Sequence, residues 1–332
     1  MATEPDSPLS IVVTTHDNRS IIRGLLQDLH ERVGPSAEVI VVDDSLDGTD
    51  GEVREFLSSH GCERWLLVRL ESRVGVPEAR NVGWKSSHGR YLLFLDSDVR
   101  LTREGNLSAI EEFVQGHPDV GVACPVVLGI DGRVQSAGVR AVLPGLFPYY
   151  PFSRLELQVP ARPVYTFAPH GAAMLFRREA LDLVGGFDET LAPGGYEELD
   201  LAWRVALAGF RTAVFPGSFV RHQGHATFGR LGETRNYYLN KLHQCRSVAK
   251  NAPVPALVVS LFVVPLVGVA DDAMRFLRSF DLRFLTCTPR YLAALVGAAP
   301  ILLRQRRAAV RSPEAMPVNR CFGKPVLADD SP

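Results

Sequence analysis

The sequence lacks the features of a small disulfide-bonded or zinc-binding protein. It has five cysteines in 332 residues, an odd number, and no two of them stand at C-x-x-C spacing. We therefore expect reduced thiols, most of them packed as small apolar side chains in a cytoplasmic protein. The five are Cys62, Cys124, Cys245, Cys287 and Cys321.

The chain also lacks an excess of charge of either sign. Its 36 basic and 37 acidic residues leave a formal net charge of −1. A general attraction to nucleic acid is therefore excluded, and any basic site must be local. Residues 1–6 are acidic and do not begin the charged-then-apolar pattern of a secretory signal, which again favours a cytoplasmic location. We find no internal repeat and no low-complexity segment.

What the sequence does have is a regular alternation over its first hundred residues. Short apolar runs are separated by segments with apolar residues at helical spacing, and both end in polar turns. Continuous apolar runs indicate strands buried on both faces, which is typical of a parallel sheet covered by helices. Right-handed connections then predict an α/β fold with a doubly wound, mostly parallel sheet. The predicted strands are 11–13, 39–42, 65–68 and 91–95, and the predicted helices are 20–31, 51–59 and 77–87.

Beyond residue 98 the alternation becomes irregular. Residues 129–170 are rich in glycine and proline, and Asp131-Gly132 is a hairpin-like turn. Elsewhere in this part we expect strands over 120–128 and 170–176, and helices over 107–115, 198–207 and 234–250. These elements complete a first domain over residues 1–250.

The remaining residues, 251–332, are predicted to form a helical, partly apolar extension. Residues 254–270 contain no charge, but 17 residues are at the lower limit for crossing a bilayer, and two prolines interrupt them. A packed or interfacial helix is the better interpretation. The apolar stretch 291–303 precedes four arginines between 304 and 311, which could meet anionic headgroups or simply form a solvated helix end. We therefore expect peripheral membrane contact through 254–311, at the inner face of the cell membrane.

Acidic residues follow two of the predicted strands. Asp43 and Asp44 end the second strand, and Asp96 and Asp98 end the fourth as an Asp-x-Asp pair. Ligands of open parallel sheets bind outside the carboxyl ends of the strands, so these side chains are expected at one crevice. Two carboxylates at this spacing suit Mg²⁺ or Mn²⁺ bound with a diphosphate. The alternative is that the aspartates only cap turns.

An ordered set of motifs then resembles family-2 glycosyltransferases of the GT-A fold, a Rossmann-like α/β fold. The resemblance covers roughly residues 9–250 and depends on the order of the motifs more than on any one of them. The motifs are residues 10–15, 41–49, 75–83, 94–98, 185–189, 196–201 and 222–225.

The resemblance implies a nucleoside-diphosphate sugar as donor, linked to UDP, dTDP or GDP, and Mn²⁺ or Mg²⁺ as cofactor. Asp98 would bind the metal, and His222 would complete its ligands from across the cleft, although a structural histidine is the alternative. The residues implied at the donor are Thr14, Asp43 and Asp44 near the base, Arg80 and Asn81 near the diphosphate or ribose, and Asp96 near the ribose.

Family members carry the catalytic base on a Glu-Asp pair that opens a helix. Here the pair is Glu197-Glu198, and Glu198 takes the aspartate position, so we predict Glu198 as base with Glu197 as the alternate. Acidic residues in a first helical turn are also stabilised by the helix dipole without any catalytic role. The segment 193–195 before them favours a mobile loop. Gly171 and Ala172 would line the acceptor side.

The predicted function is inverting, metal-dependent transfer of one sugar to an acceptor hydroxyl, of the bacterial type. The arginine-flanked tail favours a lipid-linked acceptor or a cell-envelope glycan. A processive polysaccharide synthase would carry a Gln-x-x-Arg-Trp motif and several membrane spans, and this chain has neither. A sugar nucleotidyltransferase would have a glycine-rich phosphate loop after the first strand, but residues 14–18 contain no glycine. A non-catalytic nucleotide-sugar binder is the other alternative; it could lose either the metal site or the base, and the presence of Asp98, His222 and Glu198 together argues against it.

Overall fold

The computed structural model describes residues 9–34, 36–102, 107–143, 147–149, 159–224 and 232–312. Residues 1–6, His225 and Cys321, which entered the predictions above, lie outside these ranges. The other four cysteines are buried and form no disulfide, as their spacing predicts.

The elements follow the predicted alternation closely. The helices are α1 (Arg19–Val33), α2 (Thr49–His60), α3 (Val76–Lys85), α4 (Leu107–Gly116), α5 (Arg178–Val184), α6 (Glu197–Leu207), α7 (Glu233–Asn251), α8 (Val254–Ser279) and α9 (Cys287–Ala308), with short 3₁₀ turns η1 (Glu189–Leu191) and η3 (Phe284–Thr286). The strands are β1 (Leu9–Thr15), β2 (Glu38–Asp43), β3 (Trp65–Arg69), β4 (Tyr91–Asp96), β5 (Val99–Leu101), β6 (Val120–Leu128), β7 (Val134–Ser136), β8 (Arg140–Leu143), β9 (Phe147–Tyr149), β10 (Val164–Thr166), β11 (Ala173–Arg177) and β12 (Arg211–His222).

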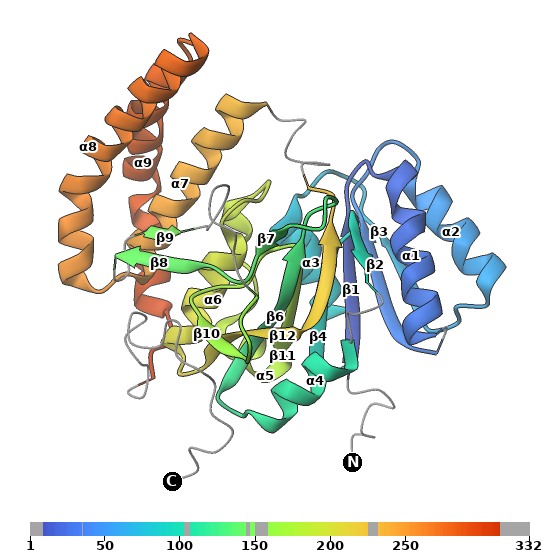
Figure 1. Cartoon of the computed structure of the whole chain (residues 1–332). Helices are drawn as coiled ribbons and strands as arrows, with labels where there is room; N and C mark the ends of the chain where they lie inside the picture. The colour runs from blue at the N-terminus through green and yellow to red at the C-terminus, as the bar shows by residue number, and fades with distance from the viewer. Residues whose placement is uncertain are drawn as a thin grey trace.

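One large sheet runs through the molecule in the order β10-β12-β6-β11-β4-β1-β2-β3 (Figure 1). The half formed by β4, β1, β2 and β3 is parallel throughout. β11 is antiparallel to both of its neighbours, β4 and β6, whereas β6 and β12 are parallel to each other. The smaller strands β5 and β7 pair with β12 and β6.

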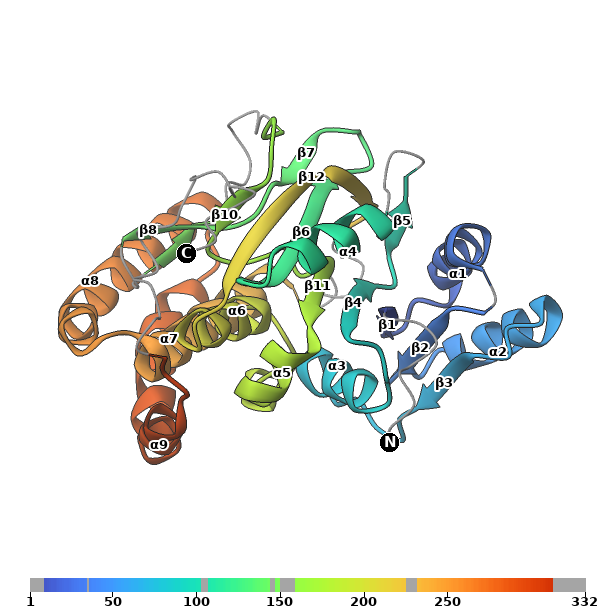
Figure 2. The same cartoon turned by 90° about the horizontal axis from the view of Figure 1, so that it is seen from below.

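Helices cover both faces of this sheet, and the strand residues alternate between them. Ile11 and Val13 of β1 pack in the cluster that contains the apolar faces of α1, α2 and α4. Val12 packs on the other face, with residues of α5 and α6. Figure 2 shows α3, α5 and α6 along one side of the sheet and α4 on the other. Each central strand is thus buried on both sides, which is why its sequence is a continuous apolar run.

The antiparallel placement of β11 is the main feature that the sequence did not predict. The expected strand 170–176 is shorter in the structure, because residues 170–172 form a turn in which the Ala173 N–H donates to the carbonyl of His170. The predicted Asp131-Gly132 turn does join an antiparallel pair, β6 and β7.

The last three long helices pack side by side at the edge of the molecule farthest from α1 and α2 (Figure 1). α8 is continuous through Pro265, so the uncharged stretch 254–270 forms one helix with the residues that follow it. Among the described residues, one segment is long and apolar enough to cross a membrane, Phe284–Ala308, with a mean hydropathy of 1.3.

Candidate active site

The predicted acidic residues lie together at the carboxyl ends of neighbouring strands. Asp43 is the last residue of β2, and Asp96 is the last residue of β4. In the register of the sheet Thr15 of β1 lies opposite Asp43, and Thr14 lies opposite Asp96. The strand ends are therefore level, and their side chains share one edge of the sheet.

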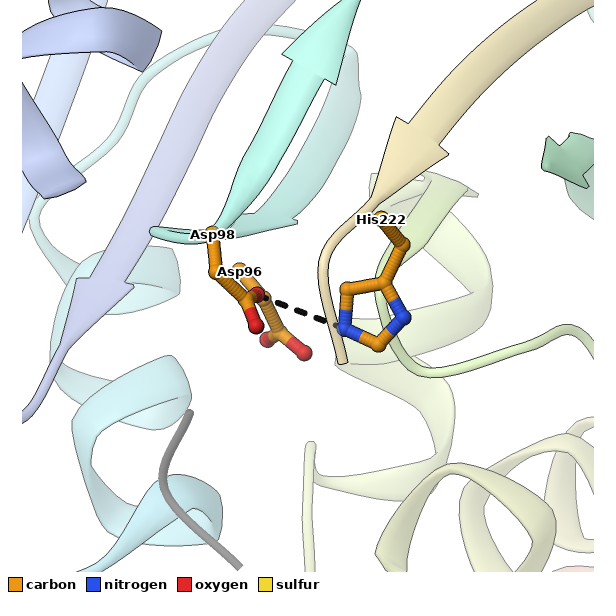
Figure 3. A group of neighbouring side chains, drawn as sticks. All are labelled: Asp96, Asp98 and His222. Carbon is orange, nitrogen blue, oxygen red and sulfur yellow. Dashed lines mark ion pairs between the residues drawn. The ribbon is translucent and has the colours of Figure 1, made fainter. Parts of the chain in front are cut away.

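Three of these residues form a cluster that could hold a metal ion. One ligand atom each from Asp96, Asp98 and His222 lies within 4.8 Å of the other two (Figure 3). His222 Nε2 is 3.3 Å from Asp98 Oδ1. Two carboxylates and an imidazole are a donor set that suits Mn²⁺ and also accepts Mg²⁺.

Strand pairing explains how His222 reaches residues so far from it in the sequence. β5 follows Asp98 directly, and it pairs antiparallel with the end of β12, where His222 lies opposite Val99. The Gln223 N–H also donates to the carbonyl of Asp98 at 3.1 Å. The last residue of β12 is thereby fixed beside the Asp-x-Asp turn.

Three further side chains that the sequence predictions did not name contact the predicted site residues. Gln135 Oε1 is 3.1 Å from His222 Nδ1, and the ring of His170 lies 5.3 Å from that of His222. Burial, aided by the neighbouring His222, lowers the pKa of His170 to about 3, so this ring is neutral. His16 bonds to Asp44 at 2.7 Å. Nothing in the sequence singled out Gln135, because it is one of several polar residues in a glycine-rich hairpin. His16 could have been found, because it stands in the loop after the first strand, where ligand contacts are expected.

Arg80 links the cluster to the predicted catalytic pair. It lies on α3 with 2% of its side chain exposed. One terminal nitrogen donates to Asp96 Oδ1 and to the carbonyl of Gly171, both at 2.8 Å, and the other donates to Glu197 Oε1 at 2.9 Å. The guanidinium predicted to contact the donor therefore also ties β4, the turn before β11 and α6 together.

Glu197 and Glu198 are the first two residues of α6, and both are buried. Burial raises the pKa of Glu197, and the positive charge of Arg80 opposes that rise. Glu198 lies against Gly171: a Cβ on that glycine would be 3.5 Å from the carboxyl carbon of Glu198. Thus Glu197 is engaged with Arg80, and Glu198 faces the segment predicted to line the acceptor side.

The loop before this pair, predicted to be mobile, is held on two sides. The Val76 N–H at the start of α3 donates to the carbonyl of Pro193 at 2.9 Å. On α7, His243 Nδ1 bonds to the carbonyl of Gly195 at 2.8 Å. Gly75 has φ +88°, and a Cβ there would lie 2.8 Å from Pro193 Cα, so only glycine allows this close approach.

The two aspartates at the end of β2 have different surroundings. Asp44 accepts from the backbone N–H groups of Val74 and Gly75, both at 3.0 Å, and bonds to His16. Burial alone would raise the pKa of Asp44, but these hydrogen bonds outweigh it and lower the pKa. Asp43 is fully buried with its carboxylate bonded to Ser45, and burial raises its pKa.

Asn81 makes contacts that differ from the donor contact predicted for it. Its amide nitrogen donates to the carbonyl of Phe187 at 2.9 Å and to Glu189 Oε1 at 2.8 Å. Its amide oxygen accepts from the Phe187 N–H at 2.8 Å. The side chain thus joins α3 to the segment that leads into η1, because that turn exposes backbone groups that need partners.

With this geometry in place, the comparison with known families is decisive. Residues 10–185, more than half of the chain, match the model of Glycosyl transferase family 2. The chain belongs to this family. Its similarity to the Pre-mycofactocin glycosyltransferase of Mycobacterium tuberculosis is 30% identity over 214 residues, which are 64% of this chain and 42% of that protein. The family-2 chain therefore spans less than half the length of that relative.

Solved structures show the same fold. GalNAc-T7 with UDP, GalNAc and Mn²⁺ superposes with a TM-score of 0.56 at 16% identity, over 75% of this chain and 51% of that one. The mannosyltransferase PcManGT from Pyrobaculum calidifontis with GDP-Man and Mn²⁺ gives a TM-score of 0.52 at 20% identity, over 94% and 83%. At these identities the likeness shows the fold, and it confirms the predicted GT-A class.

Proposed function

We propose that this family-2 chain is an inverting glycosyltransferase that moves one sugar from a nucleoside-diphosphate sugar to an acceptor hydroxyl, dependent on Mn²⁺ or Mg²⁺. The observation that carries the proposal is the position of Arg80, which hydrogen-bonds both Asp96 of the Asp-x-Asp turn and Glu197 of the acidic pair. One buried guanidinium thus joins the cluster that could hold a metal ion to the acidic pair at the start of α6.

The side chains of the Asp96, Asp98 and His222 cluster suit a divalent cation. Asp98 and His222 would bind it, with Asp96 beside them. A bound divalent ion would neutralise the negative charge that develops on the departing diphosphate. The presence of Mn²⁺ with a nucleotide or nucleotide sugar in the two solved structures of the same fold supports this choice.

We propose the roles of the other site residues from where their side chains lie. Glu198 would take the proton of the acceptor hydroxyl, and Gly171 and Ala172 would leave room for the acceptor beside it. Arg80 would orient Asp96 and Glu197. We propose that Thr14, Asp43 and Asp44 lie at the nucleotide base of a UDP-, dTDP- or GDP-sugar, with the catalytic domain over 1–250 and a helical extension over 251–332.

The first test measures donor hydrolysis with UDP-, dTDP- and GDP-sugars, with Mn²⁺ and with EDTA. We expect one nucleotide to support Mn²⁺-dependent release of the diphosphate, and Asp98→Asn to abolish it. Asp182→Asn, at an exposed aspartate of α5, is the matched control and should keep full activity. Donor binding without turnover would favour the non-catalytic alternative, and formation of a nucleotide sugar from a sugar phosphate would favour the nucleotidyltransferase.

We also propose that the extension contacts the inner face of the cell membrane, which would suit a lipid-linked or cell-envelope acceptor. Large apolar side chains recur along one face of α8 and its C-cap, and Phe262, Leu266 and Phe280 are each at least 70% exposed. The full set is Val258, Phe262, Leu266, Val269, Leu277 and Phe280. We call it the α8 apolar stripe.

Charge favours a membrane over a second protein as the occupant of the stripe. The end of α9 carries a group of arginines, and Arg306 donates to the carbonyls of Ala249 and Lys250, beside the start of α8. Three more, Arg304, Arg307 and Arg311, are exposed. Each basic residue at an anionic surface contributes about 1 kcal/mol to binding.

Vesicle flotation tests this contact. Wild-type protein should float with vesicles that contain anionic lipid and less with purely zwitterionic ones. The double variant Phe262→Ser with Leu266→Ser should lose flotation, whereas Leu183→Ser, at an exposed leucine of α5, should not. Equal flotation of all three proteins, or a wild-type dimer that the double variant dissociates, would contradict the membrane assignment.

A further inference from the structure

The hairpin formed by β6 and β7 brings a single polar side chain to His222. Gln135 is the middle residue of β7, and its Oε1 lies 3.1 Å from His222 Nδ1. The turn is closed by backbone hydrogen bonds from Gly129 to Arg133 and from Gly132 to Gly129. Together with His222 and Gln223, this hairpin lines a cavity of about 320 Å³.

Gln135 reaches His222 because the ladder is irregular at this residue. Val127 of β6 lies opposite Ser136, but the next residue, Leu128, lies opposite Val134. β7 therefore has one residue more than β6 between these pairs, and that extra residue is Gln135. Such β-bulges redirect a side chain and are frequent beside active sites.

The chemistry of the contact sets the protonation of the ring. The amide oxygen of Gln135 faces His222 Nδ1 and can only accept, so this contact favours the hydrogen on Nδ1. In the neutral ring Nε2 then has a free lone pair, and this is the atom 3.3 Å from Asp98 Oδ1. This lone pair and the carboxylate of Asp98 are then two ligand atoms that a cation can bind together. The amide nitrogen of Gln135 lies beside Gly224, 3.4 Å from the position that a Cβ on this glycine would take.

We propose that Gln135 is a positioning residue for the metal site: it holds His222 in the Nδ1–H tautomer, with the lone pair of Nε2 directed at the cation. The inference rests on the metal role proposed for His222. Hydrogen bonds of this kind behind a ligating histidine typically change metal affinity by about 10–100-fold. Without Gln135, we expect the ring to adopt the Nε2–H tautomer and donate to Asp98.

The test compares wild type with Gln135→Met, which has a similar shape but no amide, and with Gln135→Glu, whose carboxylate also accepts from Nδ1. Arg133→Ala, an exposed residue of the same hairpin and the same cavity, is the matched control. Histidine ¹⁵N–¹H correlation spectra of the metal-free proteins, assigned with His222→Ala, report the tautomer at alkaline pH. Isothermal titration with Mn²⁺ reports affinity independently of turnover.

We expect the Nδ1–H form in wild type, Gln135→Glu and Arg133→Ala, with Mn²⁺ affinity close to that of wild type in Arg133→Ala and no weaker in Gln135→Glu, whose carboxylate makes the ring more basic. Gln135→Met should show the Nε2–H form and bind Mn²⁺ roughly 10–100-fold more weakly. If that variant does not fold, Gln135→Asn, which is one methylene shorter, takes its place. An unchanged tautomer or unchanged affinity in the folded variant overturns the proposal. If His222→Ala binds Mn²⁺ like wild type, His222 is not a metal ligand, and Gln135 cannot position it for that role. A change of tautomer in Gln135→Met together with that result would show that the hydrogen bond exists and that the metal assignment is the part that is wrong.

Discussion

Arg80 and Glu197 form a buried ion pair between α3 and α6, 2.9 Å apart, although 117 residues separate them in the sequence. Both side chains are almost completely excluded from solvent. The same guanidinium bonds Asp96, so the two acidic motifs are connected through one cation. Such a group can fix the geometry of a site even if it never touches the substrate.

Replacing Arg80 by methionine should therefore cost stability as well as activity. The change leaves Glu197 buried without its cation, and breaking a buried pair in this way costs about 3–5 kcal/mol. Urea unfolding followed by circular dichroism measures the loss. Arg23→Met, which removes an exposed pair with Glu52, should cost at most about 1 kcal/mol. Similar losses in the two variants would show that Arg80 is not a structural link.

The pair Glu197-Glu198 allows the base to be identified by two matched variants. We expect Glu198→Gln to lower kcat by about 10²–10⁴-fold, the usual contribution of general base catalysis, with donor affinity unchanged. Glu197→Gln should mainly lower the free energy of unfolding, because Glu197 is the partner of Arg80. Single-turnover transfer and donor titration separate these effects. If Glu197→Gln is inactive while Glu198→Gln keeps its turnover, the assignment of the base is wrong.

The sequence predicted the parallel half of the sheet because burial on both faces leaves a direct trace in composition. β1, β2 and β4 are unbroken apolar runs, and the aspartates after them could be placed at one edge by the geometry of parallel strands alone. A strand's direction leaves no such trace. β11, which is antiparallel to both of its neighbours, has the same kind of apolar sequence as the strands of the parallel half.

The parts of the site that could not be predicted depend on long-range contacts. A buried arginine that pairs with Glu197 looks in the sequence like any residue of an amphipathic helix. Gln135 owes its position to a bulge, which depends on the pairing of two strands. Asn81 follows Arg80 in the same motif, but neighbouring residues on a helix face different directions, and the bonds of its amide to segment 187–189 depend on tertiary packing.

A buried cluster of charged residues between α6 and the end of α7 makes the free energy of unfolding depend on pH. Asp200 has no exposed surface and bonds to Lys250 and Asn251 through one oxygen and to Arg204 through the other. Burial by itself would raise the pKa of Asp200, but the charges of Lys250 and Arg204 outweigh it, and the pKa is lowered.

Because the folded-state pKa is depressed, Asp200 stabilises the fold fully above its unfolded pKa, near 3.9, and this contribution is lost as the pH falls below that value. Asp200→Asn should unfold more easily than wild type at pH 7, and the difference should shrink between about pH 4 and pH 3. Urea unfolding at pH 7, 5, 4 and 3 measures this. Asp182→Asn, on the exposed surface of α5, is the control and should show a small difference at every pH. A constant gap between Asp200→Asn and wild type would mean that the carboxylate does not contribute through its charge.

A substitution at Gly171 can test acceptor binding without a change in stability. A Cβ on this residue would lie 3.5 Å from the Glu198 carboxyl carbon and 3.7 Å from a terminal nitrogen of Arg80, which are ordinary contact distances. Gly171→Ala should therefore fold with near wild-type stability, yet place a methyl group where we propose that the acceptor hydroxyl approaches Glu198. We expect a raised KM for the acceptor, with unchanged Mn²⁺-dependent hydrolysis of the donor.

Gly75→Ala is the opposite case, because its Cβ would collide with the backbone of Pro193 at a φ that favours glycine, so stability should fall. Steady-state kinetics with varied acceptor, together with thermal unfolding of both variants, decides the matter, and an unchanged acceptor KM in Gly171→Ala would place the acceptor elsewhere.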